Sequence, residues 1–283
     1  MARLSDSPAR PLVGAAWLRT LGTGLVLYLI VTVATVATDN PHLVPSLLML
    51  GALLIPVTFV VYVFERLSVA ADVLPELAAC FVVGGLVGTA AAAVLEYETL
   101  LDLGALPMLA VGLIEESVKL ALPLLLFLRR RFLDPSAGVL LGVAAGMGFA
   151  SFETMGYGLV ELIQSHGSIG ATEALLAVRG VLSPANHAAW TGLVCAVLWR
   201  ARAGGQAADS RLWIPAAFIT AVVLHSLWDA TGSPAVRGMV ALLSIALLAS
   251  QLRAAQRDRS RYPTPRTVSK LSAPKGRSSF SRR

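Results

Sequence analysis

Three charged side chains interrupt a stretch of the chain that is otherwise apolar enough to cross a bilayer. Glu115, Glu116 and Lys119 lie within GLIEESVKLALPLLL, which spans residues 112–126. A charge near the centre of a transmembrane helix costs about 2.5–3.5 kcal/mol on insertion scales. Such groups must therefore be paired, hydrated or used, and the default interpretation is a buried functional site.

The composition of the chain predicts an all-α, polytopic integral membrane protein. Of its 283 residues, 56% are hydrophobic and only 14% are charged, against about 25% charged in a typical soluble protein. The mean hydropathy is +0.71. A crossing needs roughly 20 apolar residues. Eight segments approach that length, near 20–38, 43–64, 76–95, 104–128, 137–160, 182–200, 212–231 and 234–252.

The distribution of basic residues supports this count, because Lys and Arg gather on the cytoplasmic side of membrane helices. With both termini in the cytoplasm, nearly all of the 23 Lys and Arg residues fall in cytoplasmic segments. The exceptions are Lys119 within the membrane and Arg179 and Arg237 outside. The chain is therefore predicted to be a multi-pass protein of the cell membrane.

Three regions follow from these assignments. Residues 1–19 form a cytoplasmic N-terminal segment, and residues 20–252 form the transmembrane domain. Residues 253–283 are rich in Arg, Ser and Pro, and we expect them to be a disordered cytoplasmic tail. Its basic residues favour contact with anionic lipid head groups. Nucleic acid is not an expected partner, because no aromatic or folded reading element accompanies the basic residues.

Three other predicted spans each carry groups that lipid rejects. They are Glu153, His187, and His225 with Asp229. At 1.5 Å per residue from the external ends, Glu115 and Glu116 lie about 16–18 Å deep, Glu153 and His225 about 10 Å, His187 about 8 Å and Asp229 about 3 Å. All lie between the midplane and the outer face. The sequence therefore predicts one hydrated cavity that opens to the outside.

Helical spacing adds detail to this cavity. Lys119 lies four residues after Glu115 and three after Glu116, so it can compensate one glutamate while the other faces the cavity. His225 precedes Asp229 by four residues, which lets the carboxylate orient the imidazole ring. Phe149 lies one turn from Glu153. Lys119, Phe149 and Asp229 are therefore expected to support the site.

The predicted spans contain four polar islands: residues 115–119, Glu153, His187, and His225 with Asp229. Taken in order, they resemble the motifs of the PrsW family of bacterial intramembrane proteases. The resemblance rests on EESVK at 115–119, FASFE at 149–153, HAAWT from His187 and HSLWD at 225–229, and it covers about residues 105–230. This family is related to the CAAX prenyl endopeptidase and bacteriocin-immunity membrane proteins. The resemblance implies regulated proteolysis of a membrane-anchored protein, such as an anti-sigma factor, in a bacterial plasma membrane.

Peptide hydrolysis needs a base for water, a donor for the oxyanion and an acid for the leaving amine. No Ser or Cys is evidently paired with a base, so direct attack by water is favoured. In a glutamic mechanism, Glu115 or Glu116 is the base and Glu153 positions the water or the histidines. The candidate oxyanion donors are His187, His225 and Asn186.

A zinc mechanism stays open beside the glutamic one. Its three ligands would be Glu153, His187 and His225, with Glu115 or Glu116 as the base. The usual His-Glu-x-x-His spacing is absent and the family resemblance favours the glutamic version, so no cofactor is favoured. Two other classes of function also fit buried Glu, His and Asp residues. These are a proton-coupled transporter or channel, and a catalytically silent scaffold of the same fold.

Overall fold

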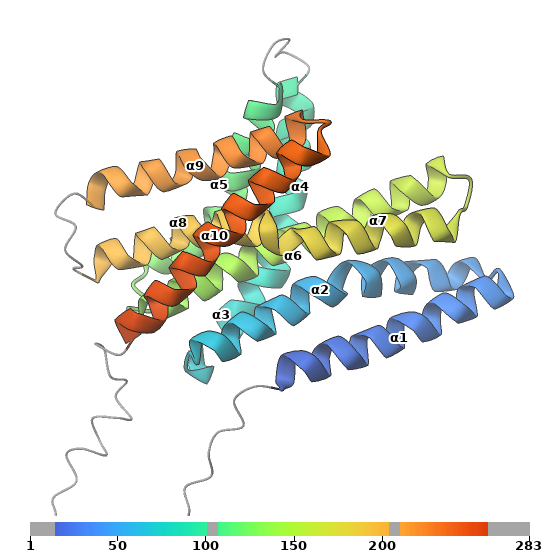
Figure 1. Ribbon diagram of the computed structural model, residues 1–283, viewed down its shortest axis with the longest axis horizontal. Coiled ribbons are helices and arrows are strands. Elements are labelled where there is room, and N and C mark those ends of the chain that lie inside the picture. Colours follow the sequence, from blue (N-terminus) through green and yellow to red (C-terminus); the bar gives the residue numbers. More distant parts are fainter. Residues whose placement is uncertain (1–14, 101–106, 204–209, 260–283) are drawn as a thin grey trace, which may run out of the picture.

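The computed structural model describes residues 15–100, 107–203 and 210–259, and within them the chain is helical with no strand (Figure 1). The long helices are α1 (Ala16–Thr38), α2 (Val44–Leu67), α4 (Gly85–Leu100), α5 (Pro107–Leu128), α6 (Pro135–Gln164), α7 (Ile169–Leu182), α8 (His187–Arg202), α9 (Ser210–Ala230) and α10 (Pro234–Arg259). The shorter elements are α3 (Leu74–Ala79) and the turns η1 (Pro41–Leu43), η2 (Ala71–Val73), η3 (Cys80–Gly84) and η4 (Ser183–Ala185).

The predicted class, an all-α polytopic membrane protein, is confirmed. Seven stretches of the described chain are long and apolar enough to cross a membrane: 16–38, 41–67, 71–97, 135–164, 169–202, 212–230 and 234–258. Helix α5 has 22 residues, enough for an eighth crossing, but it carries Glu115, Glu116 and Lys119. Helix α5 thus differs from the seven apolar stretches by its three charged residues and not by its length.

Helix α6 lies at the centre of the bundle, and glycines let α8 pack against it. In the apolar 18-residue stretch of α6, 94% of the residues are buried, against 6% in the corresponding stretch of α1. Gly138, Gly142 and Gly146 recur every four residues, so they share one face. A Cβ atom on them would clash with Trp199, Cys195 and the His187 carbonyl, respectively. This close contact fixes the start of α8 against the middle of α6.

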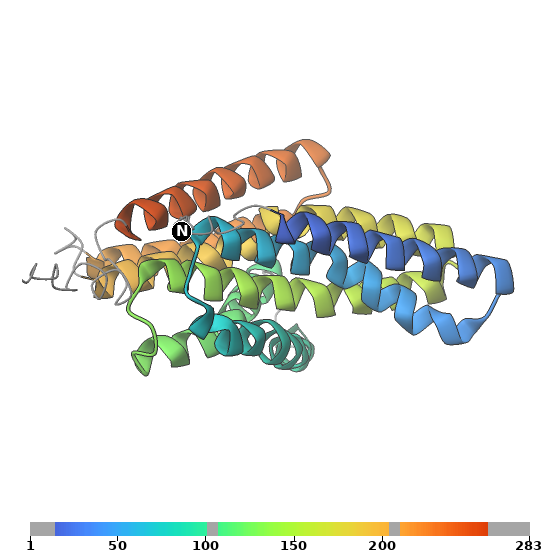
Figure 2. The same cartoon turned by 90° about the horizontal axis from the view of Figure 1, so that it is seen from below.

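Helix α4 crosses α6 at a steep angle (Figures 1 and 2). The π-helical turn η3 leads into α4, and there the backbones of Gly85 and Gly148 touch. A Cβ atom on Gly85 would lie 2.5 Å from the Gly148 carbonyl carbon. Small residues commonly allow such close crossings in membrane bundles.

The chain crosses the bundle from α7 to α8 as a broken helix, which differs from the expected span at 182–200. Helix α7 packs along α6, η4 follows, and α8 begins at His187 (Figure 1). Asn186 joins the two helices with φ −122° and ψ −94°, and its Oδ1 accepts a hydrogen bond from the His187 N–H at 2.6 Å. The expected span begins too late because Glu173 and Arg179 lower the hydropathy of α7.

His187 therefore lies farther along its apolar stretch than the expected span implies. Eighteen residues separate Ile169 from His187, which corresponds to about 27 Å of helix rather than about 8 Å. His187 instead lies at the break, against the centre of α6. A site at a broken membrane helix is a common arrangement, because the interruption frees backbone groups inside the protein.

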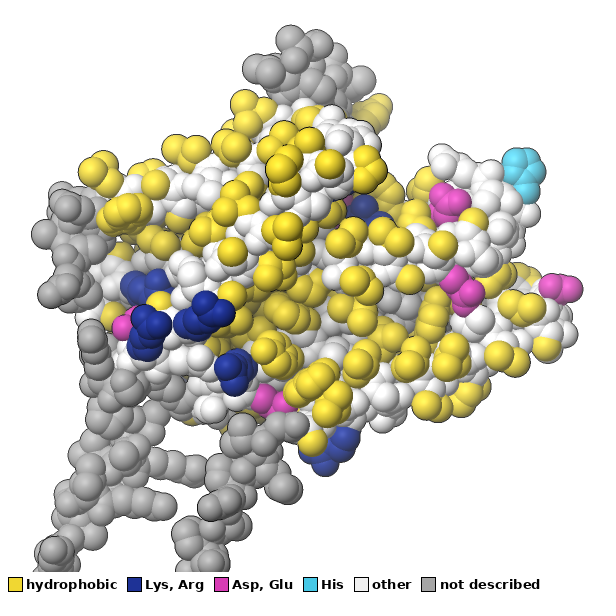
Figure 3. Space-filling model, in the orientation of Figure 1, with side chains coloured by type: hydrophobic (Ala, Val, Ile, Leu, Met, Phe, Trp, Pro, Cys, Tyr) yellow, Lys and Arg dark blue, Asp and Glu magenta, His cyan; other side chains and the backbone are white. Residues whose placement is uncertain are grey.

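The C-terminal boundary also differs from the expectation of a disordered tail from residue 253. Helix α10 continues to Arg259, where Asp258 pairs with Arg200 at 3.3 Å and Gln256 donates to the Arg66 carbonyl at 2.9 Å. These contacts stabilise the last turns of α10. Figure 3 shows Lys and Arg side chains gathered near this end of the bundle, whereas the helix faces are largely apolar. Residues 260–283 and 1–14 lie outside the described residues.

Candidate functional site

A cavity of about 420 Å³ lies between seven helices. Helices α4 to α7 and α9 line it together with the break before α8, and the start of α10 closes one side. Its charged and ionisable lining residues are Glu96, Glu115, Glu153, Tyr157, Arg179, His187, His225, Asp229 and Arg237. Four predicted polar islands on four separate spans thus meet at one cavity.

The first group of contacts, the Lys119 cluster, consists of Glu115, Glu116, Lys119, His225 and Asp229. Lys119 Nζ lies 2.9 Å from an oxygen of Glu115 and 2.9 Å from an oxygen of Glu116. The Lys119 and Glu116 side chains are completely buried. Lys119 thus compensates two carboxylates inside the bundle.

His225 completes the Lys119 cluster from α9. Its Nδ1 lies 2.9 Å from Glu116, and its Nε2 lies 3.1 Å from Asp229 and 3.4 Å from Glu115. The ring stacks on Trp190, with ring centroids 4.8 Å apart. Helix α9 comes this close to α5 because Gly112 faces Ser226 and has no side chain to keep it away.

The two adjacent glutamates have different surroundings. The Glu115 side chain is 8% exposed and lines the cavity, whereas Glu116 is fully buried and does not. Thr191 also donates to Glu116 at 3.5 Å. The helical spacing predicts that Lys119 pairs with one glutamate while the other faces the cavity. Lys119 instead contacts both, and Glu115 is the one that reaches the cavity.

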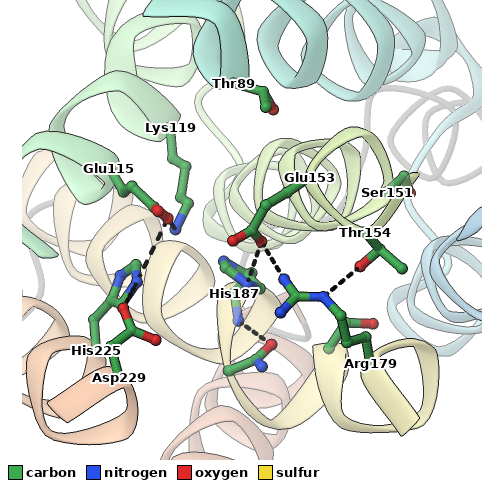
Figure 4. A network of polar contacts seen from close by, with 12 residues as sticks. Thr89, Glu115, Lys119, Ser151, Glu153, Thr154, Arg179, His187, His225 and Asp229 are labelled. Atoms are coloured by element: carbon green, nitrogen blue, oxygen red, sulfur yellow. Dashed lines mark hydrogen bonds and ion pairs between the residues drawn. The ribbon is translucent and has the colours of Figure 1, made fainter. Parts of the chain in front are cut away.

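The second group, the Arg179 cluster, consists of Glu153, Thr154, Tyr157, Arg179 and His187, and Figure 4 shows all of these except Tyr157. Glu153 Oε2 lies 2.8 Å from Arg179 Nη2 and 3.2 Å from His187 Nε2. Arg179 Nε donates to Thr154 Oγ1 at 3.2 Å, and its guanidinium lies 4.0 Å from the Tyr157 ring centre. Glu153 is therefore held from both sides, by α7 and by α8.

Two aromatic contacts join the clusters. The His187 and His225 rings lie 5.7 Å apart and almost perpendicular. Phe149 lies 5.7 Å from the His187 ring and 4.3 Å from Lys119 Nζ. Figure 4 shows both clusters facing a common gap, with the Glu153 oxygen that has no drawn contact on the side toward Lys119 and Glu115. His187 Nδ1 is buried and has no hydrogen-bond partner among the described residues.

Among the cavity residues that the sequence does not predict, two are charged and lie in helices where loops were expected. The charge distribution places Arg179 in an external loop, but it lies in α7 and contacts Glu153. Hydropathy likewise places Glu96 in a loop, yet it lies in α4 and lines the cavity, with Oε1 buried and without a hydrogen-bond partner among the described residues. An i,i+4 pattern of apolar residues in 169–182 would have indicated helix α7. Nothing local in the sequence indicates that Arg179 pairs with Glu153.

Comparison with known proteins identifies the family. The family model described as PrsW family intramembrane metalloprotease matches residues 74–252, more than half of the chain. The chain belongs to the PrsW family. Searches of curated proteins and of solved structures found no match. The PrsW match runs from α3 into α10, so it includes both clusters, and α1 and α2 lie before it.

The PrsW family is described as metalloproteases, so the possible zinc ligands Glu153, His187 and His225 must be compared with the geometry that zinc requires. Among the described residues, no three His, Cys, Asp or Glu side chains are arranged to hold a metal ion. Glu153 contacts His187 directly, and both nitrogens of His225 face carboxylates. Within the described part of the chain, Glu153, His187 and His225 are therefore not brought together as a three-ligand set, and as arranged they do not fit a zinc centre.

Proposed function

We propose that this PrsW family member is an intramembrane endopeptidase that hydrolyses a peptide bond of a membrane-anchored protein with water activated by a glutamate. Membership of a family of intramembrane proteases supports the reaction class. The observation that carries the proposal is the gap between the two clusters. Glu115 borders it from α5, and the Glu153–His187 pair borders it from α6 and α8.

Glu115 is the proposed general base. A base must reach the proton of the attacking water, and of the two adjacent glutamates Glu115 is the one that lines the cavity. Water held between Glu115 and the free oxygen of Glu153 attacks the scissile carbonyl carbon, and its proton passes to Glu115. Glu153 positions this water. Glu116 then has a supporting role, because it holds Lys119 and His225 in place.

The histidines and Asn186 are proposed to serve the oxyanion and the leaving group. The side-chain Oδ1 of Asn186 accepts from the His187 N–H, so the side-chain NH2 group of Asn186 stays available as an oxyanion donor beside His187. His225 has carboxylates at both nitrogens, and an imidazole donates from both only when it is protonated. The carboxylates thus favour a protonated His225, which suits it as the acid that gives a proton to the leaving amine as the C–N bond breaks, while Asn186 and His187 serve the oxyanion.

The proposed substrate is a membrane-anchored protein, with an anti-sigma factor as the example that the family resemblance suggests. Cleavage within a bacterial plasma membrane would start regulated proteolysis of that substrate. The basic tail is proposed to bind anionic lipid head groups on the cytoplasmic side.

The packing beneath the cavity supports a protease rather than a transporter. Deeper in the bundle, α6 and α8 meet through Gly142 against Cys195 and Gly138 against Trp199. These contacts are close and largely apolar. A proton relay needs polar groups along the path between both membrane faces, and this helix pair offers a dry barrier instead.

Comparative proteomics of membrane and shed fractions tests the proposed function. Cells that produce the wild-type protein should release a truncated membrane protein, and Glu115→Gln should reduce its release by about 10²–10⁴-fold, the usual contribution of a general base. Ser117→Ala is the matched control on α5, because Ser117 is exposed and its hydroxyl donates to the Leu113 carbonyl of its own helix. Equal release by wild type and Glu115→Gln would refute the mechanism.

Metal dependence needs its own measurement on the purified protein. We propose that no metal takes part, so cleavage should persist after prolonged treatment with a zinc chelator and should not rise when zinc is added back. Loss of cleavage with the chelator, restored by zinc, would overturn the glutamic mechanism.

A further inference from the structure

One turn of α6 forms a cradle around the Arg179 guanidinium. Its three contacts are the ion pair with Glu153 at 2.8 Å, the hydrogen bond to Thr154 at 3.2 Å and the Tyr157 ring at 4.0 Å. Residues 153, 154 and 157 fall within about one helical turn, so their side chains can converge on one group from α7. The cradle therefore joins α7 to the residue that contacts His187.

The chemistry of the cradle selects arginine. A guanidinium is planar and carries donors at fixed angles, so it can pair with a carboxylate, donate to a hydroxyl and stack on a ring at once. The ammonium of a lysine is a compact point charge without the flat face. A lysine could still pair with Glu153, but it could not stack on the Tyr157 ring with a flat face or donate to Thr154 from the same rigid plane.

Arg179 also determines which oxygen of Glu153 remains available. Glu153 Oε2 contacts both Arg179 and His187, and the other oxygen faces the gap between the clusters (Figure 4). The terminal torsion of a glutamate is broad and has no sharp minimum of its own. A contact on each side of Oε2 is therefore what fixes the plane of the carboxylate.

We infer that Arg179 is a positioning residue of the reaction, which holds Glu153 so that one oxygen engages His187 and the other is directed at the attacking water. This inference rests on the proposed function. The competing role for Arg179 is that of a simple staple between α6 and α7. Its side chain is 29% exposed at the cavity, and exposed ion pairs contribute little to stability, which favours positioning.

Chemical rescue separates the positioning role from the staple. Arg179→Ala should lower kcat by about 10- to 100-fold, as is typical when a supporting partner of a site residue is lost, with KM changed less than about twofold. Because Arg179 lines the cavity, its removal opens a space that a guanidinium ion can enter. Millimolar guanidinium chloride, far below denaturing concentrations, should restore much of kcat, whereas sodium chloride at equal ionic strength should not. Guanidinium chloride should restore kcat of Arg179→Lys only in part, because the lysine side chain still fills some of the space.

A matched control is available at the opposite end of the bundle. Arg131 pairs with Glu76 at 2.6 Å, and its side chain is 59% exposed. Arg131→Ala removes an arginine that also joins two elements, yet it should leave kcat unchanged and show no response to guanidinium. An Arg179→Ala variant with normal kcat, or one whose loss guanidinium does not reverse, would overturn the inference.

A readout independent of turnover keeps this inference distinct from the proposed function. The chain has four histidines, so ¹⁵N-histidine spectra are simple to assign with a His187→Gln reference. The His187 Nε2 resonance should shift in Arg179→Ala and return with guanidinium. If this happens while no variant cleaves any protein, Arg179 still positions Glu153 and the proposed protease activity fails. An unchanged resonance would contradict positioning even in an active enzyme.

Discussion

The two clusters at the cavity contain the same chemical parts but differ in how tightly they are enclosed. Each combines a glutamate, a histidine and a cation: Glu116, His225 and Lys119 in one, and Glu153, His187 and Arg179 in the other. In the Lys119 cluster, both glutamates contact the lysine and both imidazole nitrogens face carboxylates. In the Arg179 cluster, the cation is 29% exposed and His187 Nδ1 has no hydrogen-bond partner within the described part of the chain.

This difference separates a supporting role from a reactive one. A group of charges that is fully buried and fully paired gains little from moving, because any displaced member leaves an uncompensated charge in a medium of low polarity. A cluster that borders water has spare hydrogen-bonding capacity for a substrate. We expect the fully buried pair of Lys119 and Glu116 to hold the helices together. Glu115, His225 and the Arg179 cluster border the cavity, and we expect them to adjust as the reaction proceeds.

Replacing the two cations should give the largest contrast. Lys119→Met leaves two buried acids without their cation, and breaking a buried pair of this kind typically costs about 3–5 kcal/mol. Arg179→Met leaves Glu153 beside the cavity, where water can hydrate it. Thermal unfolding in detergent should therefore show a large fall in Tm for Lys119→Met and a small one for Arg179→Met. An equal fall in Tm for the two variants would show that the difference in burial between Lys119 and Arg179 does not affect stability.

The glycine contacts that bring each cluster together should give a smaller contrast. A Cβ atom on Gly146 meets the backbone of His187, whereas a Cβ atom on Gly112 meets the movable Ser226 hydroxyl at 2.6 Å. Gly146→Ala should destabilise the protein by about 1–3 kcal/mol through overpacking and reduce cleavage, and Gly112→Ala should do less. Gly156→Ala is the control, because nothing lies within 4 Å of its Cβ position. A stronger effect at Gly112 would reverse the comparison.

The smallest expected effect comes from Asp229. His225 Nε2 keeps a second carboxylate, Glu115, at 3.4 Å after Asp229 loses its charge. Loss of an orienting partner usually lowers kcat by about 10-fold or more. Asp229→Asn should therefore lower kcat by a smaller factor, with no change in Tm. Assays of purified protein with a cleaved membrane peptide measure this directly. A loss as large as that of Glu115→Gln would give Asp229 a direct part in the reaction.

The membrane class and the meeting of the four polar islands could be predicted from the sequence, because charges within apolar segments are costly unless they gather at a shared site. Glu115, Glu153, His187 and His225 all border the cavity. Helix α7 escaped prediction because Glu173 and Arg179 resemble loop residues when only hydropathy is counted. Glu173 bonds to Thr32 on α1 and Arg179 to Glu153 on α6, so each is satisfied by a residue distant in the sequence. Pairing of this kind depends on packing and has no local signature.

The interruption at Asn186 has a consequence for how the chain tolerates change. In a continuous helix, each inserted residue rotates everything after it by about 100°, so an insertion before His187 would turn its ring away from Glu153. The break absorbs such a rotation before α8 begins, and Gly146 keeps the first turn of α8 in register with α6. An insertion or deletion in α7, which lines the cavity, can thus be tolerated while the His187 imidazole stays directed at Glu153.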